Sequence, residues 1–192
     1  MANTSVMIVG VGGQGTLLAS RILGNVAIKK GFDVKVSEVH GMAQRGGSVV
    51  TYVKYGDKVY SPIISEGQAD IIIAFEELEA YRWLPYLKKG GRIIVNTQRI
   101  DPMPVIVGLK KYPDSIIEKI HSLGAEVIPV DALKLALEAG SVKAVNVVLM
   151  GVMAKYTDID KEDWLNVIEN TVPARFLEIN KKAFELGLAL NN

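Results

Sequence analysis

The sequence of 192 residues contains no cysteine, and this absence removes several kinds of chemistry. Without thiols the chain forms no disulfides, and it offers no thiolates for an iron–sulfur cluster or a cysteine-type zinc site. Histidine is also scarce, because His40 and His121 are the two that the sequence holds. A metal site built mainly from imidazoles is therefore not expected.

The sequence also has no large excess of positive or negative charge. Lysine and arginine number 22 against 21 acidic residues, which gives a formal net charge of +1 and indicates no general affinity for nucleic acid or anionic membranes. The sequence has no apolar run long enough to span a bilayer and does not begin like a signal peptide. With 49% hydrophobic residues, we expect a cytoplasmic protein in which residues 1–192 form a single α/β domain.

The most informative segment is the opening SVMIVGVGGQGT, residues 5–16. An apolar run stops at a cluster of glycines and a helical pattern follows at once, which predicts a strand, a tight turn and a helix N-terminus. Without Cβ atoms the turn can bring unpaired backbone N–H groups close to an anion, and the amide of Gln14 could serve a ligand or a neighbouring loop. Close helix–strand packing without any ligand is the alternative. The candidate residues are Gly10, Gly12, Gly13, Gln14, Gly15 and Thr16.

The remaining pattern alternates between strands and helices, and turns helical beyond about residue 142. Expected strands cover residues 32–37, 49–55, 58–64, 69–75, 92–96, 105–107 and 126–130. Expected helices cover residues 76–88, 115–123, 145–155, 160–169 and 174–188, together with one that Asp131 can cap. Residues 49–64 are expected to form a hairpin about Gly56 and Asp57. The predicted fold is a doubly wound, mostly parallel, Rossmann-like sheet with a β-hairpin insertion and a helical C-terminal cap.

A second glycine-rich loop follows the second predicted strand. Arg45 offers a planar fork for a carboxylate or phosphate, Gln44 an orienting amide, and Gly46 and Gly47 allow a close backbone approach. We interpret the loop as the wall of a binding site; the alternative is a turn in which Arg45 pairs with a local acid. His40 could act as a general base or could simply be hydrogen-bonded within the loop.

Two further residues bear on function. Asn146 begins the apolar helix, where it could cap the helix or bond to another loop. Glu38 lies near the place of the acidic residue that holds the ribose in a dinucleotide site. The chain turns there into a loop and a hairpin, which argues against NAD, so a stand-alone nucleotide-binding oxidoreductase is kept only as an alternative.

Three segments together resemble one family. They are residues 10–15 (GVGGQG), residues 41–47 (GMAQRGG), and Asn146 with residues 180–184 (NKKAF). This combination resembles the gamma-type subunit or domain of the 2-oxoacid:ferredoxin oxidoreductases, over nearly the whole chain. Length and helical tail are similar to the small beta subunit of the indolepyruvate branch.

The resemblance implies an enzyme subunit that is inactive alone, in a complex that converts a 2-oxoacid, such as indolepyruvate or another aryl pyruvate, to its acyl-coenzyme A. Thiamine diphosphate, magnesium and iron–sulfur clusters are expected on a larger, cysteine-containing partner that passes electrons to ferredoxin. For this chain the resemblance implies no resident cofactor, no metal ligand and no assigned catalytic residue. Its loops, from residue 10 to 16 and from residue 44 to 47, are expected to meet and to complete a site with the partner, with coenzyme A as a co-substrate. A non-catalytic assembly subunit, and a homodimer of the isolated chain, stay open.

Overall fold

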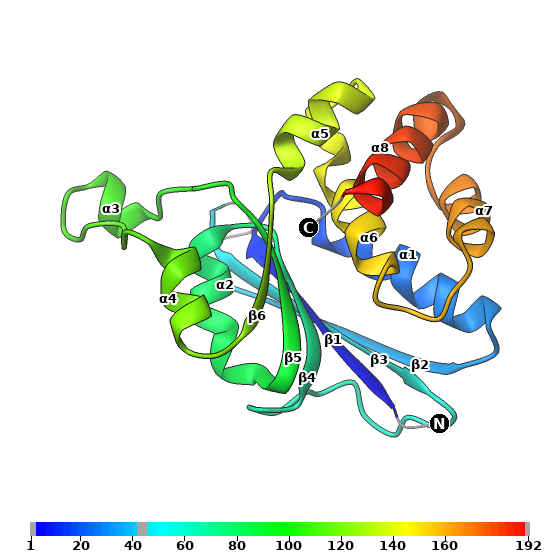
Figure 1. Ribbon diagram of the computed structural model, residues 1–192, viewed down its shortest axis with the longest axis horizontal. Helices are drawn as coiled ribbons and strands as arrows, with labels where there is room; N and C mark the ends of the chain where they lie inside the picture. The colour runs from blue at the N-terminus through cyan, green and yellow to red at the C-terminus, as the bar shows by residue number, and fades with distance from the viewer. Residues whose placement is uncertain (1–2, 42–45, 191–192) are drawn as a thin grey trace.

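The computed structural model describes residues 3–41 and 46–190, which form one six-stranded sheet flanked by helices on both faces (Figure 1). The strands are β1 (Thr4–Val11), β2 (Asp33–His40), β3 (Ser48–Gly56), β4 (Ala69–Ala74), β5 (Leu87–Asn96) and β6 (Glu126–Val130). The helices are α1 (Thr16–Lys29), α2 (Glu77–Trp83), α3 (Met103–Ile106), α4 (Ile116–Ser122), α5 (Ala132–Ala139), α6 (Val145–Ala154), α7 (Lys161–Thr171) and α8 (Leu177–Ala189). Single 3-10 turns are η1 (Leu84–Tyr86), η2 (Val142–Ala144) and η3 (Ala174–Phe176).

The strand order is β2-β3-β1-β4-β5-β6, and the pairing is mixed. β1, β4, β5 and β6 are parallel neighbours, whereas β3 is antiparallel to both β1 and β2. The chain therefore passes from β1 through α1 to the edge strand β2, and β3 then lies between β1 and β2. The expected α/β architecture with a mostly parallel sheet is confirmed.

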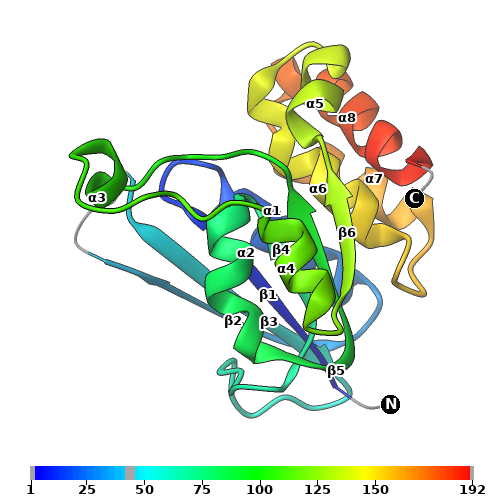
Figure 2. The same ribbon diagram turned by 60° about the vertical axis from the view of Figure 1, so that its left-hand side comes forward.

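The hairpin was expected in the wrong place. β3 does not turn back onto residues 58–64, which form no strand; it pairs along its length with β2 across the loop that starts at Gly41. A second correction concerns residues 105–107, expected as a short strand. They lie in and just after the helical turn α3, which projects from the body of the molecule (Figures 1 and 2).

The two faces of the sheet carry separate apolar clusters, because successive side chains of a strand point to opposite sides. From β1, Val6 and Ile8 pack with α1 and the C-terminal helices, whereas Met7 and Val9 pack with α2 and α4. The predicted apolar helix is α6, which is buried at every position from Val145 to Ala154. The C-terminal helices thus form a cap over the α1 face (Figure 1).

Candidate functional site

The predicted strand, glycine turn and helix are present at the carboxyl edge of the sheet. β1 ends at Val11 and α1 begins at Thr16, which is 7% exposed. Gly13 and Gly15 have φ values of 101° and 86°, a left-handed conformation that favours glycine. The backbone nitrogens of Gly13, Gly15 and Thr16 have no acceptor among the described residues. N–H groups at the N-terminus of a helix can bind an anion or a carbonyl oxygen.

The side-chain amide of Gln14 is hydrogen-bonded within the protein, to its own turn and to the residue after β4. Its Oε1 accepts a 2.8 Å hydrogen bond from the backbone nitrogen of Val11, and its Nε2 donates at 2.9 Å to the carbonyl oxygen of Phe75. A Cβ at Gly10 would lie 2.9 Å from that Oε1 and 3.0 Å from the Cβ of Phe75. Gln14 therefore shapes the turn, and Gly10 leaves room for it.

Asn96, a residue without an assigned role in the sequence analysis, connects the neighbouring strand ends. This side chain is 1% exposed at the end of β5 and donates at 3.0 Å to the same Phe75 carbonyl that Gln14 contacts. Its Oδ1 accepts at 3.2 Å from the backbone nitrogen of Ala132, the first residue of α5. The feature of the sequence that could have identified Asn96 is its position as a polar residue directly after an apolar run.

Asn146 packs against the glycine turn. Its Nδ2 lies 3.3 Å from the carbonyl oxygen of Gly15, to which it donates, and its Oδ1 accepts from the backbone nitrogen of Val147. A Cβ at Gly15 would meet this Nδ2 at 2.7 Å, so the contact needs glycine there. Of the two roles considered for Asn146, bonding to another loop is the one observed; the residue before α6 is Ala144.

The two glycine-rich bends meet directly. The backbone nitrogen of Gly12 donates at 2.9 Å to the carbonyl oxygen of Gly47, and the next pair along, Val11 and Ser48, is the last of the β1–β3 register. Gly46 has a φ of 78°. Gln44 and Arg45 lie outside the described residues, so their expected placement stays a prediction.

The returning end of the second bend is also held from α2. The hydroxyl of Ser48 donates to Oε2 of Glu79, and the indole Nε1 of Trp83 donates to the same oxygen at 3.2 Å. Arg82 Nε donates at 3.1 Å to the other carboxylate oxygen. The side chain of Glu79 is 5% exposed, and these donors offset the cost of burying its charge. No feature of the local sequence singled out this contact, because Ser48 and Glu79 lie on separate elements.

His40 and Glu38 line the other side of the glycine turn. His40 Nδ1 is 3.5 Å from Glu38 Oε1, and the hydroxyl of Thr51 donates at 3.3 Å to the second oxygen of Glu38. The imidazole is half exposed. β3 lies between β1 and β2, so Glu38 is one strand farther from the glycine turn than the acidic residue of a dinucleotide fold.

Several of the predicted site residues line two hollows that share Gly13 and Gly15, whereas Gly10, Gly46 and Gly47 line neither. The outer hollow, of about 390 Å³, is lined by Gly12, Gly13, Gly15, Thr16, Leu17, Glu38, His40 and Val49. The inner hollow, of about 440 Å³, is lined by Gly13, Gln14, Gly15, Gln98, Ile100, Leu133, Val142, Lys143, Val145 and Asn146. Lys143 adds a cation that the sequence analysis did not select.

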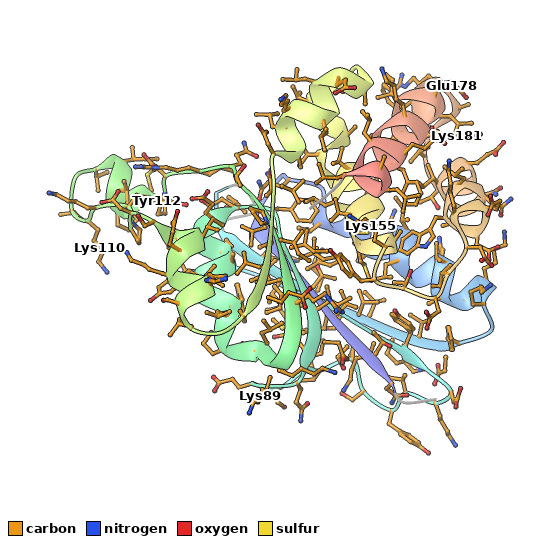
Figure 3. All side chains as sticks on the ribbon, in the orientation of Figure 1. Lys89, Lys110, Tyr112, Lys155, Glu178 and Lys181 are labelled. Carbon is orange, nitrogen blue, oxygen red and sulfur yellow. The ribbon has the colours of Figure 1, made fainter. Side chains whose placement is uncertain are left out.

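Glu76, at the end of β4, is fully engaged inside the protein. It is 1% exposed and accepts from the backbone nitrogens of Glu79 and Ile100 and, at 2.5 Å, from the hydroxyl of Tyr112. Tyr112, labelled in Figure 3, comes from the segment before α4 and lies beside α2. Burial and the Glu76 carboxylate raise the pKa of this phenol well above its usual value. Glu76 therefore fixes the loop after β5 and is not free for a ligand.

Among the residues with described positions, no three or more His, Asp or Glu side chains are grouped so that they could hold a metal ion. Within the same ranges, no helix combines the length and the apolar character needed to cross a membrane.

Comparison with known proteins adds to this geometry. The sequence matches the family described as pyruvate ferredoxin/flavodoxin oxidoreductase over residues 5–190. The indolepyruvate oxidoreductase subunits IorB of Thermococcus kodakarensis and Pyrococcus horikoshii are 42% and 44% identical to it, over 98% of this chain and 96% of each relative. The gamma subunit of a keto/oxoacid ferredoxin oxidoreductase from Geobacter sulfurreducens PCA is similar in structure, with a TM-score of 0.72 and 26% identity, over 96% of this chain and 95% of that one.

Proposed function

Because this chain belongs to the pyruvate ferredoxin/flavodoxin oxidoreductase family, as a small subunit of a 2-oxoacid:ferredoxin oxidoreductase, we propose that its two glycine-rich bends complete an active site on a larger subunit. The complex converts an aryl pyruvate such as indolepyruvate to its acyl-coenzyme A. Relatives that are 42% and 44% identical and carry the indolepyruvate name support this substrate class.

The observation that carries the proposal is the Gly12–Gly47 hydrogen bond. It joins Gly12, at the turn before α1, to Gly47, the residue that precedes β3. Gln44 and Arg45 stand just before Gly46 and Gly47 in the sequence, so we expect their side chains near the same turn. Both bends lie at the carboxyl edge of a mostly parallel sheet, where open α/β sheets bind ligands. The role of this chain is to contact the anionic groups of the substrate or of coenzyme A and to position them, and it forms no covalent intermediate.

The larger subunit holds thiamine diphosphate, magnesium and the iron–sulfur clusters, and passes electrons to ferredoxin. The family resemblance supports this division of labour, and the absence of cysteine for a cluster in the present chain agrees with it. Co-purification from the native source should recover a brown, cysteine-rich partner with bound thiamine diphosphate. Recovery of the chain without such a partner would contradict the assignment.

Arg45→Ala in the reconstituted complex tests the proposal. We expect the fold and the assembly to be kept and coenzyme A-dependent turnover to fall, because the planar fork that binds carboxylate or phosphate is lost. Arg92→Ala is the matched control, since Arg92 lies in the middle of β5 and pairs with Glu126 at the start of β6, away from the carboxyl edge of the sheet. Unchanged kinetics for Arg45→Ala would remove the anion-binding role. Full activity after alteration of both bends would instead identify a subunit needed only for assembly.

A further inference from the structure

The two edges of the sheet differ in how well they are protected. β6 forms one edge and has five residues, with Pro129 among them. β2 forms the other edge and has eight residues, no proline and an unbroken register with β3. None of its side chains is buried, and Val36 and Val39 are 47% and 51% exposed. Proteins usually shorten, bend or charge an edge strand to prevent pairing. β2 is neither shortened nor interrupted, and its charged residues Asp33, Lys35 and Glu38 are of both signs.

An apolar trough runs beside this strand. The face of α1 above β2 presents Leu17, Arg21, Asn25 and Ile28, at helical spacing, and both apolar residues are exposed by 45% or more. A hollow of about 410 Å³ lies between this stripe and Val34 and Val36 of β2. The trough therefore joins an unpaired strand to an exposed helix face, which together can receive a strand and a helix.

We propose that this edge binds a second copy of the chain, with the two β2 strands antiparallel about a two-fold axis at Val36. Such an axis stands perpendicular to the sheet, so paired residues must point to the same face. Centred on Val36, the register sets Val36 against Val36, Lys35 against Ser37 and Val34 against Glu38, with no like charges opposed. Centring on Lys35 or Glu38 would set like charges against each other.

The helices support the same arrangement. α1 packs over both β2 and β3, and a Cβ at Gly24 would lie 3.7 Å from the side chain of Val36. Two such helices across a β2–β2 seam would stand about two strand spacings apart, roughly 10 Å, which is the usual distance between packed helices. The axis would bring Leu17 of each copy toward Ile28 of the other, and Arg21 toward Asn25. Apolar ends of the stripe thus meet apolar ends, and its polar central residues face each other.

The absence of cysteine makes a sharp test of the full-length chain available. Directly opposed residues of an antiparallel pair have Cα atoms about 4.5–5.5 Å apart, which suits a disulfide. Val36→Cys should therefore form a covalent dimer on mild oxidation. Val39→Cys is the matched control on the same strand, because its two copies would be separated by about 20 Å and should not link. Equal cross-linking of both variants, or none, would overturn the proposed register.

Light scattering of the purified chain completes the test. The unmodified chain should have twice the mass of one copy. Val36→Arg should halve that mass by opposing two cations at the axis, whereas Leu123→Arg, at the exposed residue that follows α4, should not. A monomeric unmodified chain, or a Val36→Arg variant that stays dimeric, would refute the proposal. If Val36→Arg prevented only the binding of the larger subunit, the β2 edge would be part of the interface with that subunit and the proposal would be wrong.

Discussion

The backbone nitrogen of Gly12 donates a hydrogen bond of 2.9 Å to the carbonyl oxygen of Gly47, and this contact joins two bends separated by α1 and β2. It follows from the strand order. Since β3 is antiparallel to β1, the start of β3 lies beside the end of β1, and Val11 pairs with Ser48. Insertion of β3 between β1 and β2 therefore brings the second bend to the glycine turn, where an ordinary dinucleotide fold would have its second strand.

Glu79 should hold the root of the second bend. Glu79→Gln replaces a carboxylate that faces Ser48, Trp83 and Arg82 with an amide whose NH2 group must face a donor. We expect the free energy of unfolding, measured in urea, to fall by about 1–3 kcal/mol.

Glu77→Gln on the same helix is the matched control. Burial and the nearby Glu76 and Glu118 carboxylates raise the pKa of Glu77, so its charge is unfavourable in the folded state. Removing that charge at pH 7 should leave the stability unchanged or increase it slightly. A loss as large as that of Glu79→Gln would show that the Ser48 contact has no special role.

The chain should not bind NAD(H) or NADP(H) tightly. β3 separates β2 from β1, and Glu38 already accepts from Thr51 and lies beside His40, so the ribose would lack its usual acidic partner. Calorimetric titration of the purified chain should give no tight binding signal, and Glu38→Gln should not change it. Tight binding that Glu38→Gln weakens would restore the alternative of a stand-alone nucleotide-dependent oxidoreductase.

Features that depend on neighbouring residues in the sequence were predicted well. The apolar run at residues 126–130 is β6 as expected, and Asp131 caps α5 by accepting from the backbone nitrogen of Lys134. The strand expected at residues 105–107 from local residue preferences was wrong. Their β-branched side chains favour a strand, but Pro102 and Pro104 start a helical turn, since proline fits the first positions of a helix.

Features that depend on distant contacts could not be read from the sequence. An alternating pattern identifies β3 as a strand without saying that its neighbours are β1 and β2. The amide of Gln14 is used inside the protein because the carbonyl of Phe75, from the end of another strand, lies within reach. The sequence thus located the glycine turn, while the fold decided which of its groups remain available to a ligand.

The attachment of α7 to α1 should make stability depend on acid pH. Lys29 and Lys30 each have Nζ 3.1 Å from a carboxylate oxygen of Asp163, and they lower the pKa of Asp163 below its ordinary value of 3.8. A lowered pKa in the folded state contributes stability above the unfolded pKa, and that contribution is lost as the pH falls through the folded value. The free energy of unfolding should therefore drop below about pH 4.

Asp163→Asn isolates this effect. The variant should be less stable than the parent at pH 7, and the difference should shrink as the pH is lowered from 5 to 3. Glu66→Gln, at an exposed loop position, should leave the pH profile unchanged. A difference for Asp163→Asn that does not depend on pH would mean that packing, and not the ion pairs, joins the two helices.

The contact between α6 and α8 should tolerate no added methyl group. A Cβ at Gly187 would overlap the carbonyl oxygen of Val148, and one at Gly151 would overlap the carbonyl oxygen of Phe184, so the two backbones touch where the helices cross. Gly187→Ala must push the helices apart, and we expect a loss of about 1–3 kcal/mol in the free energy of unfolding. Gly24→Ala adds the same group in α1, where the nearest atoms lie at an ordinary 3.7 and 3.8 Å, and should gain about 0.5–1 kcal/mol from helix propensity. Opposite signs for the two substitutions would establish that close backbone contact holds the cap; equal effects would show that α8 can shift without cost.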